Sequence, residues 1–233
     1  MRIILLTLFL FVSNLGLSQN PYHITIDKTS GLPSNSVYDI FQDSKGFMWF
    51  ATGKGLCRYD GNNFKTFTAD FQTSKSGSCI AEDAFGRIWY ANFDGFLYYV
   101  EKGSLKALPQ KTSLGYYRFG IIQNDLFLIQ PEAILVYDLK SLKVKAKHII
   151  NDKEVRFCYA TKEKFYVLGN YLYELGNKNG IKKYKLPEDF YAEIITPIIN
   201  TWNQKLIINS KSTAIYYSFE KGKFSKFKLN NSI

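Results

Sequence analysis

The residues of this sequence that could do chemistry are few and widely spaced. Of the two histidines, His23 and His148, neither has a cysteine, a histidine or a carboxylate at the spacing of a metal site. The three cysteines, Cys57, Cys79 and Cys158, are odd in number and show no ligand spacing. We therefore expect no metal and no cofactor, and we interpret the cysteines as small core residues.

Acidic pairs are the next candidates, because glycoside hydrolysis needs two carboxyl groups about 5 to 9.5 Å apart in a cleft. The pairs are Glu82 with Asp83, Glu188 with Asp189, and Asp138 with Asp152. The first pair aligns with residues 42–43 of the repeat described below, which favours a role in the repeat over catalysis.

Motifs of larger catalytic sites are absent. The sequence has no Walker phosphate loop, no G-x-S-x-G and no H-E-x-x-H. The stretch Gly53–Gly55 is too short for a phosphate loop and predicts a hairpin turn. His148 lacks the acidic surroundings of a phosphoacceptor histidine. We therefore predict no enzyme activity here, and any kinase activity would belong to a downstream domain.

The elements that must position these residues are predicted to be strands. The chain is 46% hydrophobic, with 17 Tyr and 19 Phe against 2 Met, a composition that favours pleated sheets. Residues 43–51 (DSKGFMWFA) align with residues 83–91 (DAFGRIWYA), forty positions further on. The alignment at this offset continues, pairing Gly55 with Gly95 and Tyr59 with Tyr99.

Weaker copies of the same pattern extend the repeat to the end of the chain. A period of about 40 residues with four short strands in each unit is typical of β-propeller blades. We predict an all-β propeller of about five four-stranded blades. The predicted blades are residues 36–68, 77–108, 118–146, 155–186 and 195–229.

Residues 1–18 read as a signal peptide. Arg2 precedes a short apolar run, and Gly16 and Ser18 fit a cleavage site before Gln19. The propeller region would then be residues 19–233, exported to the periplasm or another extracytoplasmic space. The formal charge of +10 comes from lysines scattered along the chain, which argues against nucleic acid as a partner.

The motif-bearing stretches resemble a known family. Residues 31–43 (GLPSNSVYDIFQD), 46–52 (GFMWFAT) and 55–61 (GLCRYDG) are similar to the two-component regulator propeller repeat. The second unit keeps part of this motif, whereas the later units lose its tryptophan and its Gly-Leu pair. The resemblance implies a periplasmic sensor region of a hybrid histidine kinase or related regulator, of the kind found in Bacteroidetes-like bacteria.

Three functions stay open at this level. The resemblance favours a non-catalytic sensor that binds an extracytoplasmic ligand, which would be a carbohydrate by family analogy. The sensor would pass its signal to transmembrane and output domains further along a longer chain, tethered to the inner membrane. The alternatives are a secreted propeller hydrolase or lyase acting on polysaccharide, and a propeller used for protein contacts. Absence of a convincing acid pair or metal cluster argues against the enzyme.

The motif residues are predicted to be structural, because turn and packing chemistry explains them. They are Asp43, Gly46, Trp49, Gly55, Tyr59, Asp83, Gly86, Trp89, Gly95 and Tyr99. Ligand-binding residues are predicted in the turns between second and third strands, and in the link after the second blade, since these loops share one rim. They are Lys54, Asp94, Tyr116, Tyr117, Glu132, Asn170 and Lys211.

The ends of the chain predict an open ring. Residues 22–26 (YHITI) read as the fourth strand of another blade, while the last unit already has its own fourth strand at residues 223–229. Residues 229–233 resemble the opening of a further blade. We therefore expect an arc of about five blades taken from a longer chain.

Overall fold

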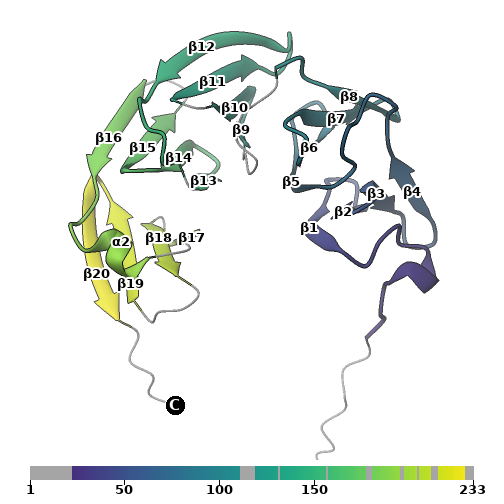
Figure 1. Cartoon of the computed structure of the whole chain (residues 1–233), viewed down its shortest axis with the longest axis horizontal. Helices are drawn as coiled ribbons and strands as arrows, with labels where there is room; N and C mark the ends of the chain where they lie inside the picture. Colours follow the sequence, from purple (N-terminus) through teal and green to yellow (C-terminus); the bar gives the residue numbers. More distant parts are fainter. Residues whose placement is uncertain are drawn as a thin grey trace, which may run out of the picture.

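The structure is a computed structural model, and it confirms an all-β fold built of five four-stranded antiparallel sheets. It describes residues 23–110, 119–130, 132–155, 157–176, 180–194, 197–203, 205–210 and 215–228. The sheets follow one another around an open arc, with the first and the last at its two ends (Figure 1). This arrangement is an incomplete propeller, as the sequence predicts.

Each sheet is a meander in which neighbouring strands in the chain are neighbours in space. Blade 1 contains β1 (Val37–Gln42), β2 (Met48–Thr52), β3 (Gly55–Tyr59) and β4 (Phe64–Phe67). Blade 2 contains β5 (Gly77–Glu82), β6 (Ile88–Asn92), β7 (Leu97–Glu101) and β8 (Ser104–Ala107). Blade 3 contains β9 (Phe119–Ile122), β10 (Asp125–Gln130), β11 (Ala133–Asp138) and β12 (Lys143–Ile149).

The last two blades repeat this plan. Blade 4 contains β13 (Phe157–Ala160), β14 (Lys164–Leu168), β15 (Tyr171–Gly176) and β16 (Ile181–Lys185). Blade 5 contains β17 (Pro197–Trp202), β18 (Lys205–Ser210), β19 (Ile215–Glu220) and β20 (Lys223–Lys228). The short helices are η1 (Lys28–Ser30), before blade 1, and α2 (Phe190–Glu193), between blades 4 and 5. Neither helix is long enough to cross a membrane.

The first strand of each blade lies on the inside of the arc and the fourth strand on the outside (Figure 1). Inner strands of successive blades contact one another, β1 with β5, β5 with β9, β9 with β13, and β13 with β17. In blades 2, 3 and 4 the central strands are buried on both faces because a neighbouring blade covers each face. In β6, for example, all five residues are buried.

Apolar side chains fill the spaces between blades. Trp49 packs with residues of blade 2 such as Tyr90 and Tyr98, and Trp89 packs with residues of blade 3 such as Leu128 and Tyr137. Burying a large ring in each gap gives the hydrophobic energy that holds one sheet against the next. Phenylalanine and leucine residues fill the later gaps, where the motif tryptophan is missing.

The alignment of blades 1 and 2 at a constant offset of forty residues is wrong beyond the second strand of each blade. Trp49 pairs with Arg58 in blade 1, whereas Trp89 pairs with Tyr99 in blade 2. The turn between β6 and β7 therefore holds one more residue than the turn between β2 and β3. Because a shift of one residue moves a side chain to the other face of a sheet, Arg58 and not Tyr59 is the counterpart of Tyr99.

The prediction of a strand over residues 22–26 is also wrong for the part that the structure describes. Residues 23–26 form no strand. Ile26 and Leu32 instead pack against the outer face of blade 1, beside Phe50 and Cys57. An apolar sheet face at the end of the arc is thus covered by a local chain segment. The residues after 228 lie outside the described part of the chain.

Candidate ligand-binding site

Alternating strand directions give the arc two rims. The turns between second and third strands meet the links between blades on one side, which we call the link rim. The turns between first and second strands, and between third and fourth strands, lie on the other side, which we call the hairpin rim. The predicted ligand-binding residues belong to the link rim.

In blade 1, the turn on the link rim fastens the neighbouring chain segments. The N–H of Gly53 donates to the carbonyl of Ser36 at 2.9 Å, and Ser76 Oγ donates to the carbonyl of Gly53 at 3.1 Å. The N–H of Lys54 donates to Thr52 Oγ1 at 3.1 Å, while the Lys54 residue is exposed. Lys54 therefore has its backbone held by the turn and its side chain in solvent.

In blade 2, the predicted binding residue is engaged inside the protein. Asp94 accepts the N–H of Phe96 at 3.0 Å through one oxygen and the hydroxyl of Tyr98 at 2.8 Å through the other. The buried Asn92 beside it donates to the carbonyl of Ser74 at 2.9 Å. This turn holds the link from blade 1, so Asp94 has a structural role.

The equivalent turns of blades 3 and 4 also contact the link between them. Glu132 forms an ion pair with Lys153 at 3.4 Å. Asp152, only 3% exposed, accepts the N–H of Asn170 at 2.8 Å and the hydroxyl of Tyr173 at 3.1 Å. Burial and then the adjacent carboxylate raise the pKa of Tyr173, which keeps its hydroxyl a donor.

The remaining predicted residues, Tyr116, Tyr117 and Lys211, lie outside the described part of the chain. On the link rim, the described candidates Asp94 and Asn170 thus serve the scaffold. Among these described candidates, Lys54 and Glu132 have exposed charged side chains, and Glu132 is paired with Lys153.

A large hollow lies on the opposite rim. A cavity of 870 Å³ opens between blades 4 and 5, and Ile121 of blade 3 reaches its wall. Its size falls within the range of about 300–1,000 Å³ typical of small-molecule sites. Tyr159 and Tyr166 line it from blade 4, and Thr201 and Leu206 line it from blade 5.

The cavity wall combines hydroxyl groups with aromatic and aliphatic surface. The hydroxyls of Tyr159 and Thr201 lie 3.5 Å apart and join the inner strands β13 and β17. Burial, followed by the nearby Glu174, raises the pKa of Tyr166, so its hydroxyl stays neutral. Lys164 at the edge forms an ion pair with Glu174 at 3.1 Å. Such a wall can hold a polar, uncharged ligand by hydrogen bonds and ring contacts.

The charged residues that line this cavity are Lys162, Glu163 and Lys164, and no described histidine or pair of carboxylates lines it. His148 lies on the outer strand β12, and His23 is exposed before blade 1. No described group of three histidine, cysteine or acidic residues could hold a metal ion. Asp138 is at the end of β11 on the hairpin rim, whereas Asp152 is in a link on the opposite rim, so this pair cannot share a cleft.

The other acidic candidates have partners within the fold. Glu82 accepts the N–H and the hydroxyl of Ser44 at 2.7 and 2.8 Å, which joins blades 2 and 1. Asp189 accepts from the hydroxyl of Tyr217 at 3.0 Å and from Lys226 at 2.6 Å. These contacts give each carboxylate a structural task.

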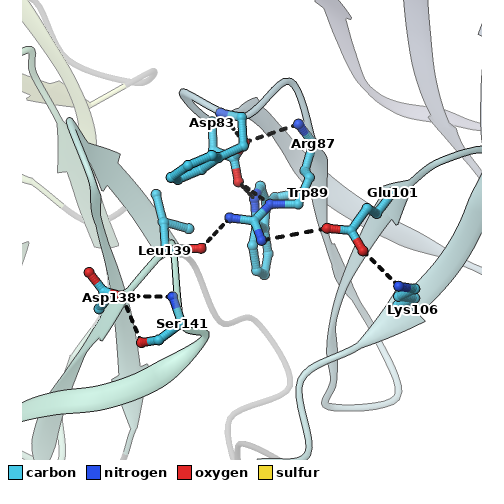
Figure 2. A network of polar contacts seen from close by, with 9 residues as sticks. Asp83, Arg87, Trp89, Glu101, Lys106, Asp138, Leu139 and Ser141 are labelled. Carbon is cyan, nitrogen blue, oxygen red and sulfur yellow. Dashed lines mark hydrogen bonds and ion pairs between the residues drawn. The ribbon is translucent and has the colours of Figure 1, made fainter.

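The repeat motif builds a clasp at the hairpin rim (Figure 2). In blade 2, Asp83 accepts the indole N–H of Trp89 at 2.7 Å and the Nε of Arg87 at 2.6 Å. Arg87 also donates to the carbonyl of Leu139 in blade 3 at 2.5 Å. Gly86 has a φ of +71°, which suits glycine at the turn inside the clasp.

Blade 1 builds the same clasp without the arginine. Asp43 accepts the indole N–H of Trp49 at 2.8 Å and the backbone N–H groups of Lys45 and Phe47 at 3.0 and 2.9 Å. Gly46 has a φ of +87° in this turn. The aspartate therefore shapes the turn and satisfies the buried indole at once.

Sequence reasoning missed the cavity residues because blades 4 and 5 lack the repeat motif. Tyrosine and threonine are common in strands, so nothing in the sequence around Tyr159 and Thr201 indicates a binding site. A search for unexpected hydroxyls on inner strands at corresponding positions of successive units would have drawn attention to this pair.

The comparisons with known proteins agree with the repeat. Residues 31–54 match the family model described as two component regulator propeller. No curated protein matches the sequence. The similarity identified from the motif is thus confirmed at the first blade.

Several solved structures share the fold. A streptogramin B lyase is 15% identical, with a TM-score of 0.68, over 87% of this chain and 72% of its own. A catalytically inactive histidine-to-alanine variant of virginiamycin B lyase from Staphylococcus aureus, with quinupristin, is 16% identical, with a TM-score of 0.66, over 86% and 73%.

The extracellular domain of a putative hybrid two component system from B. thetaiotaomicron is 20% identical, with a TM-score of 0.64. The match covers 87% of this chain and 31% of that domain, so the chain spans about a third of its length. At such identities, these structures establish the propeller fold and no more.

Proposed function

We propose that this chain is a non-catalytic, ligand-binding region of an extracytoplasmic sensor. The observation that carries the proposal is the cavity between blades 4 and 5, lined by Tyr159, Tyr166 and Thr201. The family match at residues 31–54 supports a sensor, since its description names a two component regulator. Binding at blades 4 and 5 could alter how two blades pack, and a packing change is a physical route for a signal.

The ligand class that suits this wall is a neutral carbohydrate. Tyrosine rings offer flat apolar surface to a sugar ring, and the hydroxyls of Tyr159 and Thr201 offer hydrogen bonds to its hydroxyl groups. The charges at the edge balance, because Lys164 is paired with Glu174 and Lys162 is offset by Glu163. The family analogy made from the sequence points to the same class.

A lyase is the second candidate, since virginiamycin B lyases share the fold. The inactive S. aureus variant lacks one histidine. Neither histidine of this chain, His23 or His148, lies at the cavity. This difference favours binding without catalysis.

Binding of oligosaccharides, measured by calorimetry after a screen on a glycan array, tests the proposal. We expect Tyr159→Ala and Thr201→Ala to weaken a sugar found in the screen at least tenfold, by the loss of about 1.4 kcal/mol or more. Tyr38→Ala is a matched control, because Tyr38 is a half-exposed tyrosine on the inner strand β1, away from the cavity.

The same assay separates the two rims and the two functions. Lys54→Ala should leave affinity unchanged, and a loss in that variant alone would move the site to the link rim. Unchanged affinity in both cavity variants would overturn the cavity as the site. Turnover of the bound sugar would establish the lyase or hydrolase instead.

We further propose export, with cleavage between Ser18 and Gln19, and a membrane-tethered signalling protein as the setting. Intact-mass measurement of periplasmic material tests the cleavage. Retention of residues 1–18 in the exported protein would contradict it. A transmembrane segment and an output domain in the downstream reading frame would support the setting.

A further inference from the structure

A second, smaller pocket lies between blades 1 and 2 on the hairpin rim. Its volume is 200 Å³, and its wall includes the motif residues Asp43 and Trp49. The pocket is separate from the cavity of blades 4 and 5, and the inference below does not rest on the proposed function.

Cationic side chains dominate this pocket. Lys45, Arg58, Lys65 and Lys102 line it, against the two carboxylates Asp43 and Glu82, which gives four positive and two negative charges. Both carboxylates already accept hydrogen bonds from the turn of blade 1. The wall therefore keeps an excess of two positive charges.

Arg58 supplies the guanidinium of this group. Its guanidinium carbon lies 4.4 Å from the centre of the Phe47 ring, which fixes the plane of the group. Its Nε is buried and has no hydrogen-bond partner among the described residues. A buried donor without a partner costs about 1–3 kcal/mol, so an acceptor from outside would relieve a real penalty.

The next interface along the arc solves the same problem internally (Figure 2). There, Glu101 forms an ion pair with Lys106 at 2.6 Å and lies 3.8 Å from Arg87. Arg87 Nε is bound to Asp83 and its terminal nitrogen to Leu139. The cations between blades 2 and 3 are thus matched by the protein's own oxygens.

Blade 1 has an acid at the corresponding place, but that acid is used elsewhere. Asp60 follows β3 as Glu101 ends β7, and it accepts the N–H groups of Asn62 and Asn63 at 2.9 and 2.7 Å. The bonds from Asn63 and Asn62, and to a smaller extent the charge of Arg58, lower the pKa of Asp60, and the bonds hold its carboxylate in the β3–β4 turn. No ion pair joins it to Arg58 in the described structure.

We propose that this pocket binds an oxyanion group, a carboxylate or a sulfate, in the place that Glu101 fills in the next interface. A planar guanidinium with fixed donors suits such oxygens, and three lysines add charge around it. The volume is below the usual range for a whole ligand of about 300–1,000 Å³, so the pocket takes one anionic group. That group is either a free ion or part of a larger acidic molecule.

Titration with sodium sulfate and with sodium acetate, at constant ionic strength set by sodium chloride, tests the proposal. Tryptophan fluorescence, to which Trp49 in the pocket wall contributes, reports on binding. Saturation by sulfate but not acetate would identify a tetrahedral anion, and the reverse a carboxylate. A glucuronate and a sulfated monosaccharide, tested in turn, distinguish a free ion from a group on a sugar, since the larger molecule would bind more tightly than its ion.

Three variants make the test specific. We expect Arg58→Gln to weaken the better anion at least tenfold and Lys65→Gln about threefold. Lys140→Gln, a change of the same charge at an exposed lysine of the blade 3 hairpin outside the pocket, should have no effect. Lys65 is exposed, so its variant stays informative if Arg58→Gln fails to fold.

The outcomes that overturn the proposal are equally definite. A signal that does not saturate with either salt excludes a site. Equal losses in Lys65→Gln and Lys140→Gln would show general attraction of anions by a basic protein. Unchanged affinity in a folded Arg58→Gln variant would remove Arg58, and with it the site.

Discussion

Replacing Asp83 with asparagine should weaken the fold much more than the same change at Asp43, although both residues occupy the same place in the repeat. Asp83 is 4% exposed and accepts two backbone N–H groups, the indole N–H of Trp89 and the Nε of Arg87. Asp43 accepts the same set without the arginine. The pair isolates the contribution of one buried cation.

The expected magnitudes follow from what each change leaves without a partner. Asparagine can keep the two backbone bonds through its oxygen, but its amide N–H₂ then faces the indole, which costs about 1–3 kcal/mol in either variant. In Asp83→Asn the Arg87 side chain, 7% exposed, also loses its carboxylate. Removing one partner of a buried ion pair costs about 3–5 kcal/mol in total, against about 1–3 kcal/mol for the change at Asp43. The difference between the variants should therefore be about 2 kcal/mol.

Urea unfolding followed by tryptophan fluorescence measures this difference, provided the slope of the transition is unchanged. Adding Arg87→Phe, the residue that blade 1 has at position 47, should bring Asp83→Asn back toward the cost of Asp43→Asn. Equal costs in the two single variants would refute the reasoning, because Arg87 would then gain nothing from the carboxylate.

Other predictions follow from single contacts. Tyr137→Phe should raise the free energy of unfolding by about 1 kcal/mol, because the buried hydroxyl of Tyr137 has no partner among the described residues. Tyr173→Phe should lower it by about 1–3 kcal/mol, because the hydroxyl of Tyr173 donates to Asp152. Urea midpoints compare the two variants, and a loss of stability in both would contradict the prediction for Tyr137. Gly77→Ala should lower the free energy of unfolding by about 1–3 kcal/mol, because a new Cβ would lie 2.3 Å from the carbonyl oxygen of Ala91. An unchanged thermal unfolding midpoint would show that the site tolerates the methyl group. The hydrogen bond from Lys106 lowers the pKa of Glu101, so its stabilising effect is present above the ordinary value of 4.5 and lost as the pH falls through the lower folded value. Unfolding midpoints between pH 7 and pH 3 should therefore fall less in Glu101→Gln than in the unaltered chain, and parallel curves would show that the pair contributes nothing.

The repeat itself could be read from the sequence because its signals are local. Asp43, Gly46 and Trp49 lie within seven residues, and the hydrogen bonds that link them form inside one hairpin. Turn chemistry and the strand pattern need no knowledge of the neighbouring blade. The four-stranded unit and its approximate number therefore followed from the sequence alone.

Pairing across the second hairpin was harder to predict. A single additional residue in the turn between β6 and β7 puts Tyr99 opposite Trp89, while Arg58 takes that place in blade 1. An alignment at a constant offset conceals this shift. The charged pocket between blades 1 and 2 depends on it, since Arg58 points there and Tyr59 does not line it.

The sequence by itself determined a chain of β-hairpins with a repeat that resembles a known family, because the period, the turn residues and the apolar alternation are all local to each unit. Only the tertiary structure decided which side chains of different units meet. Tyr159 and Thr201 are 42 positions apart, and their hydroxyls come together because blade 5 is placed beside blade 4 by the apolar surface between them. The position of blade 5 results from many weak contacts spread over two whole sheets, so it cannot be predicted from any short stretch of sequence.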